Sequence, residues 1–254
     1  MIRKLAFSVL ATLAVIVVPA QTLLIYTEDA PPLSMPGPDG NPIGLAVEIV
    51  QEIQNRVGNT DTIELVPWAR GMAILDKSPN ILLFSMGRTA ERNEKYQWIG
   101  PLYESAFALF SLADSKLSVK NIEDAKKATA IGVYRDDVRD QILTGLGLSN
   151  LKRVDDENML ARMLFAKRLD LIASSAVGVK AMLDATDHKE SEVKLQYVFS
   201  QTQLYIGVSK ATSPAVVKAW NEALETMKKD LTFRKLFEKY KLLDNIPGPA
   251  ITKF

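Results

Sequence analysis

Residues 80–103 read NILLFSMGRTAERNEKYQWIGPLY, and they carry the most specific structural signal of the chain. Residues 80–85 form an apolar run of strand length, which is typical of a strand buried on both faces. A turn with two arginines follows at 86–92, and apolar and aromatic residues return at 98–103. We therefore predict a buried strand that ends in a turn and leads into a second apolar segment.

Strands and helices alternate on the N-terminal side of this segment. The elements we expect there are a strand at 22–26, a helix at 44–57, a strand at 63–66, a short helix at 68–75 and the strand at 80–85. Gly58 provides a stop for the first helix. This order predicts a largely parallel sheet covered by helices, with ligands at the carboxyl ends of the strands.

The same alternation restarts after Leu102. The expected elements are strands at 106–112, 129–134, 151–154 and 170–173, and helices at 122–126, 137–146 and 157–166. A last strand at 203–208 is followed by the amphipathic pattern of long surface helices at 216–240. The pattern indicates two α/β units with a late return of the chain.

The composition is that of an ordinary globular protein. The chain has 254 residues, of which 47% are hydrophobic and 24% charged, and its formal net charge is +1. Its basic residues are spread along the chain, which argues against nucleic acid as a partner. Because it has no cysteine, disulfides, thiolate nucleophiles and cysteine-ligated metals are excluded. We expect no cofactor and no metal site.

The N-terminus has the pattern of a secretory signal peptide. Arg3 and Lys4 precede an apolar run at 5–18, and Ala20 is a small residue at the expected cleavage position. We predict a signal peptide at 1–20 and a periplasmic mature protein. An uncleaved membrane anchor is the alternative, although the run is short for a span of about 20 residues.

Three segments resemble the extracellular solute-binding proteins of family 3, which serve polar amino acid ABC transporters. The first is GLAVEI at 44–49, with Leu45 where the family usually has an aromatic residue. The second combines SMGRTAER at 85–92 with WIGPLY at 98–103. The third comprises residues 204–210, 221–224 and 233–240. Together they span nearly all of the mature chain.

The resemblance implies an α/β, two-lobed periplasmic-binding-protein-like fold. Each lobe is expected to be a mixed sheet flanked by helices, and two hinge strands are expected to cross near 103–112 and 197–205. The implied division is lobe 1 at 21–108, lobe 2 at 109–201, and a return to lobe 1 at 202–254. The ligand is expected in the cleft between the lobes, which close around it.

The first lobe offers most of the candidate ligand-binding residues. The resemblance implies that Arg92 holds a ligand carboxylate, since a guanidinium binds it through two donors. Ser85 and Thr89 flank it and would reach the same anion or cap the turn. Arg88 and Arg70 would favour an anionic ligand, or they point to solvent. Trp68 supplies a cavity wall or belongs to the core.

The second lobe departs from the pattern of α-amino acid binders. Ser175 stands where those proteins place a carboxylate for the ligand's ammonium, and a serine cannot neutralise that charge. Asp136 and Asp137 are candidates to hold a cationic group, although Asp at a helix start is also a common cap. Glu28 lies in the first-lobe loop where the family often has an aromatic residue.

The resemblance implies a protein that captures a small, carboxylate-bearing solute for an ABC-type importer and catalyses no reaction. The candidate solutes are an amino acid or a related organic acid, the expected partner is a membrane permease or receptor, and the chain is expected to be a monomer. Two alternatives are a ligand-presenting sensory protein and a small-acid dehydratase. The single histidine, His188, argues against hydrolysis by a Ser-His-Asp or multi-histidine metal site.

Overall fold

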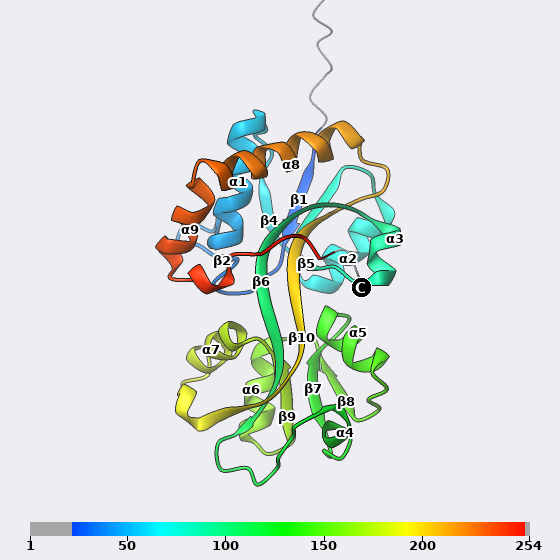
Figure 1. Ribbon diagram of the computed structural model, residues 1–254, viewed down its shortest axis with the longest axis vertical. Helices are drawn as coiled ribbons and strands as arrows, with labels where there is room; N and C mark the ends of the chain where they lie inside the picture. Colours follow the sequence, from blue (N-terminus) through cyan, green and yellow to red (C-terminus); the bar gives the residue numbers. More distant parts are fainter. Residues whose placement is uncertain (1–21, 252–254) are drawn as a thin grey trace, which may run out of the picture.

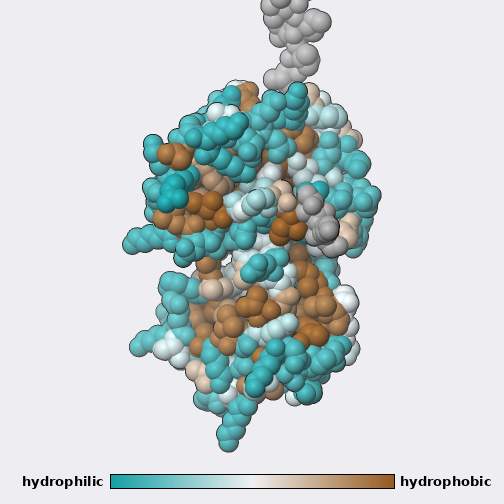
Figure 2. Space-filling model, viewed as in Figure 1, coloured by the Kyte–Doolittle hydropathy of each residue, from teal (hydrophilic) through white to brown (hydrophobic). Residues whose placement is uncertain are grey.

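The computed structural model describes residues 22–251, and the predicted signal peptide lies outside them. Two lobes are joined by two long strands, β6 (Gln97–Leu112) and β10 (Val193–Val208), which run side by side from one lobe into the other (Figure 1). The two strands pair antiparallel over almost their whole length. Figure 2 shows that the molecule narrows between the lobes, where these strands cross.

One lobe contains both ends of the described chain. Its strands are β1 (Leu24–Thr27), β4 (Ile63–Leu65) and β5 (Ile81–Gly87), with a two-stranded ribbon of β2 (Met35–Pro36) and β3 (Pro42–Ile43). Its helices are α1 (Leu45–Val57), α2 (Trp68–Lys77), α3 (Ala90–Lys95), α8 (Pro214–Lys229) and α9 (Thr232–Tyr240). Strand β1 pairs in parallel with both β4 and β5.

The other lobe is formed by the middle of the chain. Its strands are β7 (Ile131–Tyr134), β8 (Leu151–Val154) and β9 (Leu171–Ser174), and its helices are α4 (Ile122–Ala125), α5 (Val138–Gly145), α6 (Glu157–Phe165) and α7 (Ala176–Asp184). The strand order β4-β1-β5-β10-β6-β9-β7-β8 makes one continuous sheet through both lobes. Strand β7 is parallel to β8 and β9, as βαβ units require.

Helices from both ends of the chain share one core. Leu45, Ile49 and Ile53 recur every four residues along α1, and each is at most 1% exposed. They belong to the same apolar cluster as Trp220 of α8 and Phe237 of α9. This packing places the C-terminal helices in the first lobe, beside the N-terminal helix α1.

The α/β, two-lobed fold class is confirmed, but several elements differ from the sequence-based expectation. Strand β6 begins at Gln97 rather than at 106, and β10 begins at Val193 rather than at 203. The earlier start of β6 was not predicted because Pro101 lies in it, and proline is uncommon inside strands. Helix α7 was not predicted, and α3 forms where only a turn was expected. The proposed lobe boundaries stay predictions.

No helix within residues 22–251 is long and apolar enough to span a membrane.

The C-terminal segment at 246–251 crosses the two hinge strands (Figure 1, red). Gln203 of β10 is paired with Glu104 of β6 and is only 3% exposed. Its amide nitrogen donates to the Pro249 carbonyl at 3.0 Å, and its amide oxygen accepts from the Ile251 backbone N–H at 2.9 Å. Side chains alternate between the two faces of a strand. Tyr103, next to Glu104, faces the opposite side of the hinge.

We expect Gln203→Ala to lower the free energy of unfolding by about 1–3 kcal/mol, because it removes the buried hydrogen bond from the Tyr205 hydroxyl and the half-buried ones to Pro249 and Ile251. Gln201→Ala is the matched control, since Gln201 is exposed on the same strand and should change stability by less than about 0.5 kcal/mol. Urea denaturation measures both. Equal losses in the two variants would show that Gln203 does not hold the C-terminal segment.

Candidate functional site

A cavity of about 570 Å³ lies between the two lobes. Its wall is built from residues at the carboxyl ends of β1 and β5 in one lobe and of β7, β8 and β9 in the other. The polar side chains that line it include Glu28, Ser85, Asp137, Arg139, Glu157 and Ser175. Parallel strands bring such residues to one sheet edge, so distant parts of the sequence meet here.

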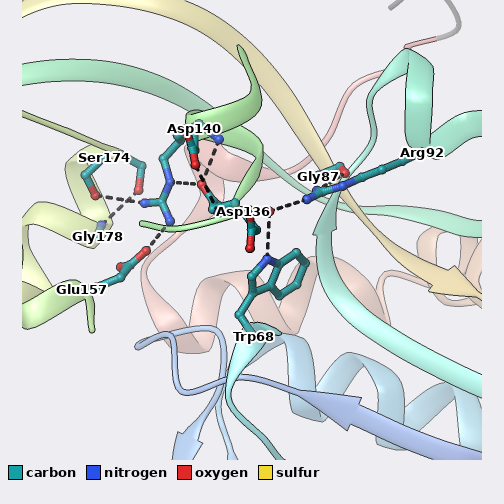
Figure 3. Close-up of polar contacts among 11 residues, drawn as sticks. Trp68, Gly87, Arg92, Asp136, Asp140, Glu157, Ser174 and Gly178 are labelled. Atoms are coloured by element: carbon teal, nitrogen blue, oxygen red, sulfur yellow. Dashed lines mark hydrogen bonds and ion pairs between the residues drawn. The ribbon is translucent and has the colours of Figure 1, made fainter. Parts of the chain in front are cut away.

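Arg139 organises the second-lobe side of the cavity. Its guanidinium donates to the carboxylates of Asp137 and Glu157 and, at 3.4 Å, to the hydroxyl of Ser174 (Figure 3). Burial works against the charge of Arg139, but the carboxylates of Asp137 and Glu157 outweigh it and raise the pKa of the guanidinium. Arg139 is therefore charged and already committed to protein acceptors.

The carboxyl of Asp137 is ionised despite its burial. Asp137 is 7% exposed, and desolvation alone would raise its pKa, but the guanidinium of Arg139 holds this pKa below its usual range. Its carboxylate also accepts from the Arg139 backbone N–H at 2.9 Å and so caps α5. The expected capping role is therefore observed, and the same carboxylate reaches the cavity.

Glu28 faces the Arg139 cluster from the first lobe. Burial raises the pKa of its carboxyl well above the usual range, and the carboxylates of Glu157 and Asp137 raise it further. Arg139 and a hydrogen bond from the Tyr134 hydroxyl oppose this effect only in part. Glu28 is thus a carboxyl whose negative charge the guanidiniums of Arg139 and Arg92 offset only in part.

Three helices begin at the cavity. Asp137, Asp156 and Ser175 cap the first turns of α5, α6 and α7, and all three line the cavity. The first turns of α5 and α6 contain acidic side chains, whereas that of α7 contains none. The partial positive charge at the start of α7 is therefore not offset by a carboxylate of its own helix.

Ser85, two residues before the end of β5, has a conformation that is unusual for a serine. Its φ angle is +63°, in the left-handed region. Its buried hydroxyl has no hydrogen-bond partner within residues 22–251, and its side chain lines the cavity. Tyr103 is 4% exposed, lines the same cavity and also has a hydroxyl without a partner in the described chain. These two hydroxyls are available to a molecule in the cavity.

Arg92 contacts the other lobe and is not a lining residue. Its guanidinium donates to the Gly87 carbonyl at 3.0 Å and to the Asp136 carbonyl at 2.9 Å (Figure 3). Trp68 donates from its indole nitrogen to the same Asp136 carbonyl at 3.1 Å, and the guanidinium lies 5.3 Å from the Trp68 ring centre. Asp136 adopts a φ of +57°, which turns the backbone at this contact.

The other predicted arginines also lie away from the cavity wall. Arg88 donates to the Asn93 side chain and lies 5.4 Å from the Trp98 ring centre, whereas Arg70 is exposed. Thr89 accepts from the Arg92 backbone N–H and caps α3. The structure does not gather the three arginines around the cavity. A ligand-binding role for the three arginines stays a prediction that this arrangement does not support. The same holds for Thr89, Trp68 and Asp136.

Four of the ten predicted residues line the cavity, namely Glu28, Ser85, Asp137 and Ser175. Sequence reasoning missed Arg139 and Glu157. Glu157 could have been predicted from the sequence, because it follows a predicted strand at 151–154 and begins the next helix, where cavity residues are expected. Arg139 had no comparable signal, since it looks like one more charged residue inside a helix.

A family model of bacterial extracellular solute-binding proteins, family 3, matches residues 23–242. The chain belongs to this family. The L-cystine-binding protein TcyJ of Escherichia coli (strain K12) is 25% identical over 225 residues, which cover 86% of this chain and 82% of TcyJ. The resemblance inferred from the three sequence motifs is confirmed.

Two solved structures illustrate the family fold. An ancestral arginine-binding protein bound to arginine has a TM-score of 0.75 at 23% identity, with 86% of this chain and 97% of that chain covered. A histidine kinase sensor domain with similarity to periplasmic binding proteins has a TM-score of 0.80 at 17% identity, with 90% and 98% covered. At these identities the likeness shows the fold alone.

Membership of the solute-binding family settles the chemical class of the protein. It is an extracytoplasmic solute-binding protein and not an enzyme, which removes the dehydratase alternative. Within residues 22–251 no group of three or more histidine, cysteine, aspartate and glutamate residues is placed to hold a metal ion. The cavity between the lobes is therefore the candidate solute-binding site.

The lobes touch where Gly87 meets Val138. A β-carbon on Gly87 would lie 2.8 Å from Val138, so we expect Gly87→Ala to push the lobes apart. If the lobes stay together, the clash should lower the free energy of unfolding by about 1–3 kcal/mol. Gly145→Ala is the control, because nothing lies within 4 Å of that position. Small-angle X-ray scattering should show a larger radius of gyration for Gly87→Ala alone. An unchanged radius with full stability would contradict this contact.

We expect Glu28→Gln to raise the melting temperature at pH 7. The folded-state pKa of Glu28 lies above its unfolded value, so folded protein holds an extra proton between the two values, and stability falls as pH rises through that window. Glutamine cannot ionise, so the variant does not lose this stability. The difference in melting temperature between variant and wild type should therefore shrink as pH is lowered. Differential scanning calorimetry tests this, with the exposed Glu64→Gln as control. A Glu28→Gln variant with a lower melting temperature than wild type at pH 7 would refute the raised pKa of Glu28.

Proposed function

We propose that this protein captures an amino acid or a closely related solute in the cavity between its lobes and delivers it to an ABC-type importer. The family assignment supports solute capture, and both TcyJ and the arginine-binding relative are described by the amino acid they bind. The inner-membrane permease is the proposed partner, and the periplasm is the proposed location.

The charge arrangement of the cavity carries the proposal. An amino acid presents an ammonium and a carboxylate a few ångströms apart. The negative charge of the Glu28 carboxyl is offset only in part, which suits the ammonium. The first turn of α7, with Ser175 and Gly178 at the cavity wall, suits the carboxylate. The buried hydroxyl of Ser85 offers a further hydrogen bond.

A sensory role is the second candidate function. The sensor domain described above shares the fold over nearly its whole length, and the same cavity would serve a receptor as well as a permease. The two roles share the capture step and differ only in the membrane protein that contacts the closed lobes. Co-purification with a permease or with a receptor kinase separates them.

We expect amino acids to raise the melting temperature of the protein that begins at Gln21. A ligand that binds only the folded state adds about 2.7 kcal/mol of stability at 100 times its Kd. A thermal-shift screen should cover neutral, acidic and basic amino acids, together with dicarboxylates and small cyclic acids as comparison classes. A shift with the comparison classes and none with amino acids would refute the proposed ligand.

A further inference from the structure

We propose that the cavity selects an amino acid with a cationic side chain and that Glu28 receives one of the two cationic groups of the ligand. This inference rests on the proposed capture of an amino acid in the same cavity. It replaces the anionic ligand that three arginines had suggested, because carboxylates line the cavity and those three arginines do not.

The charges on the cavity wall are unequal. The acidic lining residues are Glu28, Asp29, Asp137, Asp155, Asp156 and Glu157. Against these six carboxylates, Arg139 is the one basic residue among the lining residues of the described chain. Asp155 pairs with Arg135 and Asp156 with Arg162 at the exposed rim, so their effect is screened. The charge imbalance that a ligand would meet is therefore set by the residues inside the cavity, beyond this rim.

Inside the cavity, Arg139 is shared by Asp137 and Glu157, which leaves this trio with a net charge of −1. Glu28 adds a second negative charge when it is ionised, and the buried guanidinium of Arg92, which acts on both Asp137 and Glu28, offsets one of the two. One negative charge remains, and a zwitterionic ligand with a neutral side chain brings no net charge to balance it. A ligand with an additional ammonium or guanidinium brings a net charge of +1 and lets Glu28 ionise beside it.

A second, independent observation marks the cavity as a place for ligand donors. The hydroxyl of Tyr103 is buried, lines the cavity and has no partner within residues 22–251. A phenolic oxygen accepts hydrogen bonds from an ammonium or guanidinium as readily as it donates. Tyr103 comes from the hinge strand β6 and Glu28 from the loop after β1, so the two groups meet the ligand from different elements.

The two buried arginines near the cavity do not offer a guanidinium to an acidic side chain, since Arg139 is already paired and Arg92 does not line the cavity. Arg139 already binds two carboxylates and the Ser174 hydroxyl. Arg92 is 2% exposed and donates to the carbonyls of Gly87 and Asp136. A ligand with an anionic side chain would add a further negative charge without gaining a counter-charge. The cavity therefore disfavours acidic amino acids.

Isothermal titration calorimetry on the mature protein tests the inference with pairs of ligands that differ in charge. We expect L-arginine or L-lysine to bind at least about 30-fold more tightly than L-citrulline or L-norleucine, which match them in shape without the charge. Equal affinities within a pair would overturn the cationic class and leave amino acid capture standing. Binding by no amino acid would overturn both proposals.

Two variants test the residue assignment. We expect Glu28→Gln to lose at least about 30-fold in affinity for the cationic ligand and little for its neutral partner. Glu64→Gln removes the same charge from an exposed position of the same lobe that does not line the cavity, and it should stay within about 3-fold of wild type. Circular dichroism confirms that each variant is folded. Equal losses in the two variants, or an unchanged Glu28→Gln, would show that Glu28 is not the cation-binding group.

Discussion

The antiparallel pairing of β6 and β10 is the constraint on which the rest of the structure depends. Each strand has 16 residues, and their ladder belongs to the sheets of both lobes. One face of this ribbon lines the cavity through Tyr103 and Leu204, while the other face, at Glu104 and Gln203, holds the C-terminal segment. The hinge is therefore fixed on one side by hydrogen bonds, and on the other side it forms the wall of the binding cavity.

Electrostatics within the cavity favour function over stability. A core of similar volume without Glu28 would be more stable, because this carboxyl is desolvated next to the carboxylates of Glu157 and Asp137. Arg139 makes the arrangement tolerable by pairing with two of the three carboxylates, although its single positive charge offsets only one of them. Binding sites commonly retain such an unbalanced group, because a ligand of opposite charge recovers the lost interaction on binding.

Local sequence patterns predicted most helices and strands, but they did not predict contacts between residues far apart in the chain. The apolar periodicity of α1 and the strand at 80–85 follow from residues close in sequence. The candidates Glu28, Ser85, Asp137 and Ser175 follow from a general rule, since ligands gather at strand ends. The pair of Arg139 with Glu157 joins helices 18 residues apart, and the bond from Arg92 to Asp136 crosses 44 residues. The first pairing depends on how two helices of the second lobe pack, and the second depends on how the lobes are oriented, and no local pattern specifies either.

The loop at 135–139 links the cavity to the contact between the lobes. The Asp136 carbonyl accepts from Arg92 and Trp68 of the other lobe, and the next residue, Asp137, pairs with Arg139 at the cavity wall. Asp136 is held in a left-handed conformation, so its carbonyl and the Asp137 carboxylate have fixed relative directions. The Asp136 carbonyl already accepts from Arg92 at 2.9 Å, so the described arrangement holds both sets of contacts at once. Because one short loop carries both, a ligand that binds at Asp137 and Arg139 would also favour the contact between the lobes.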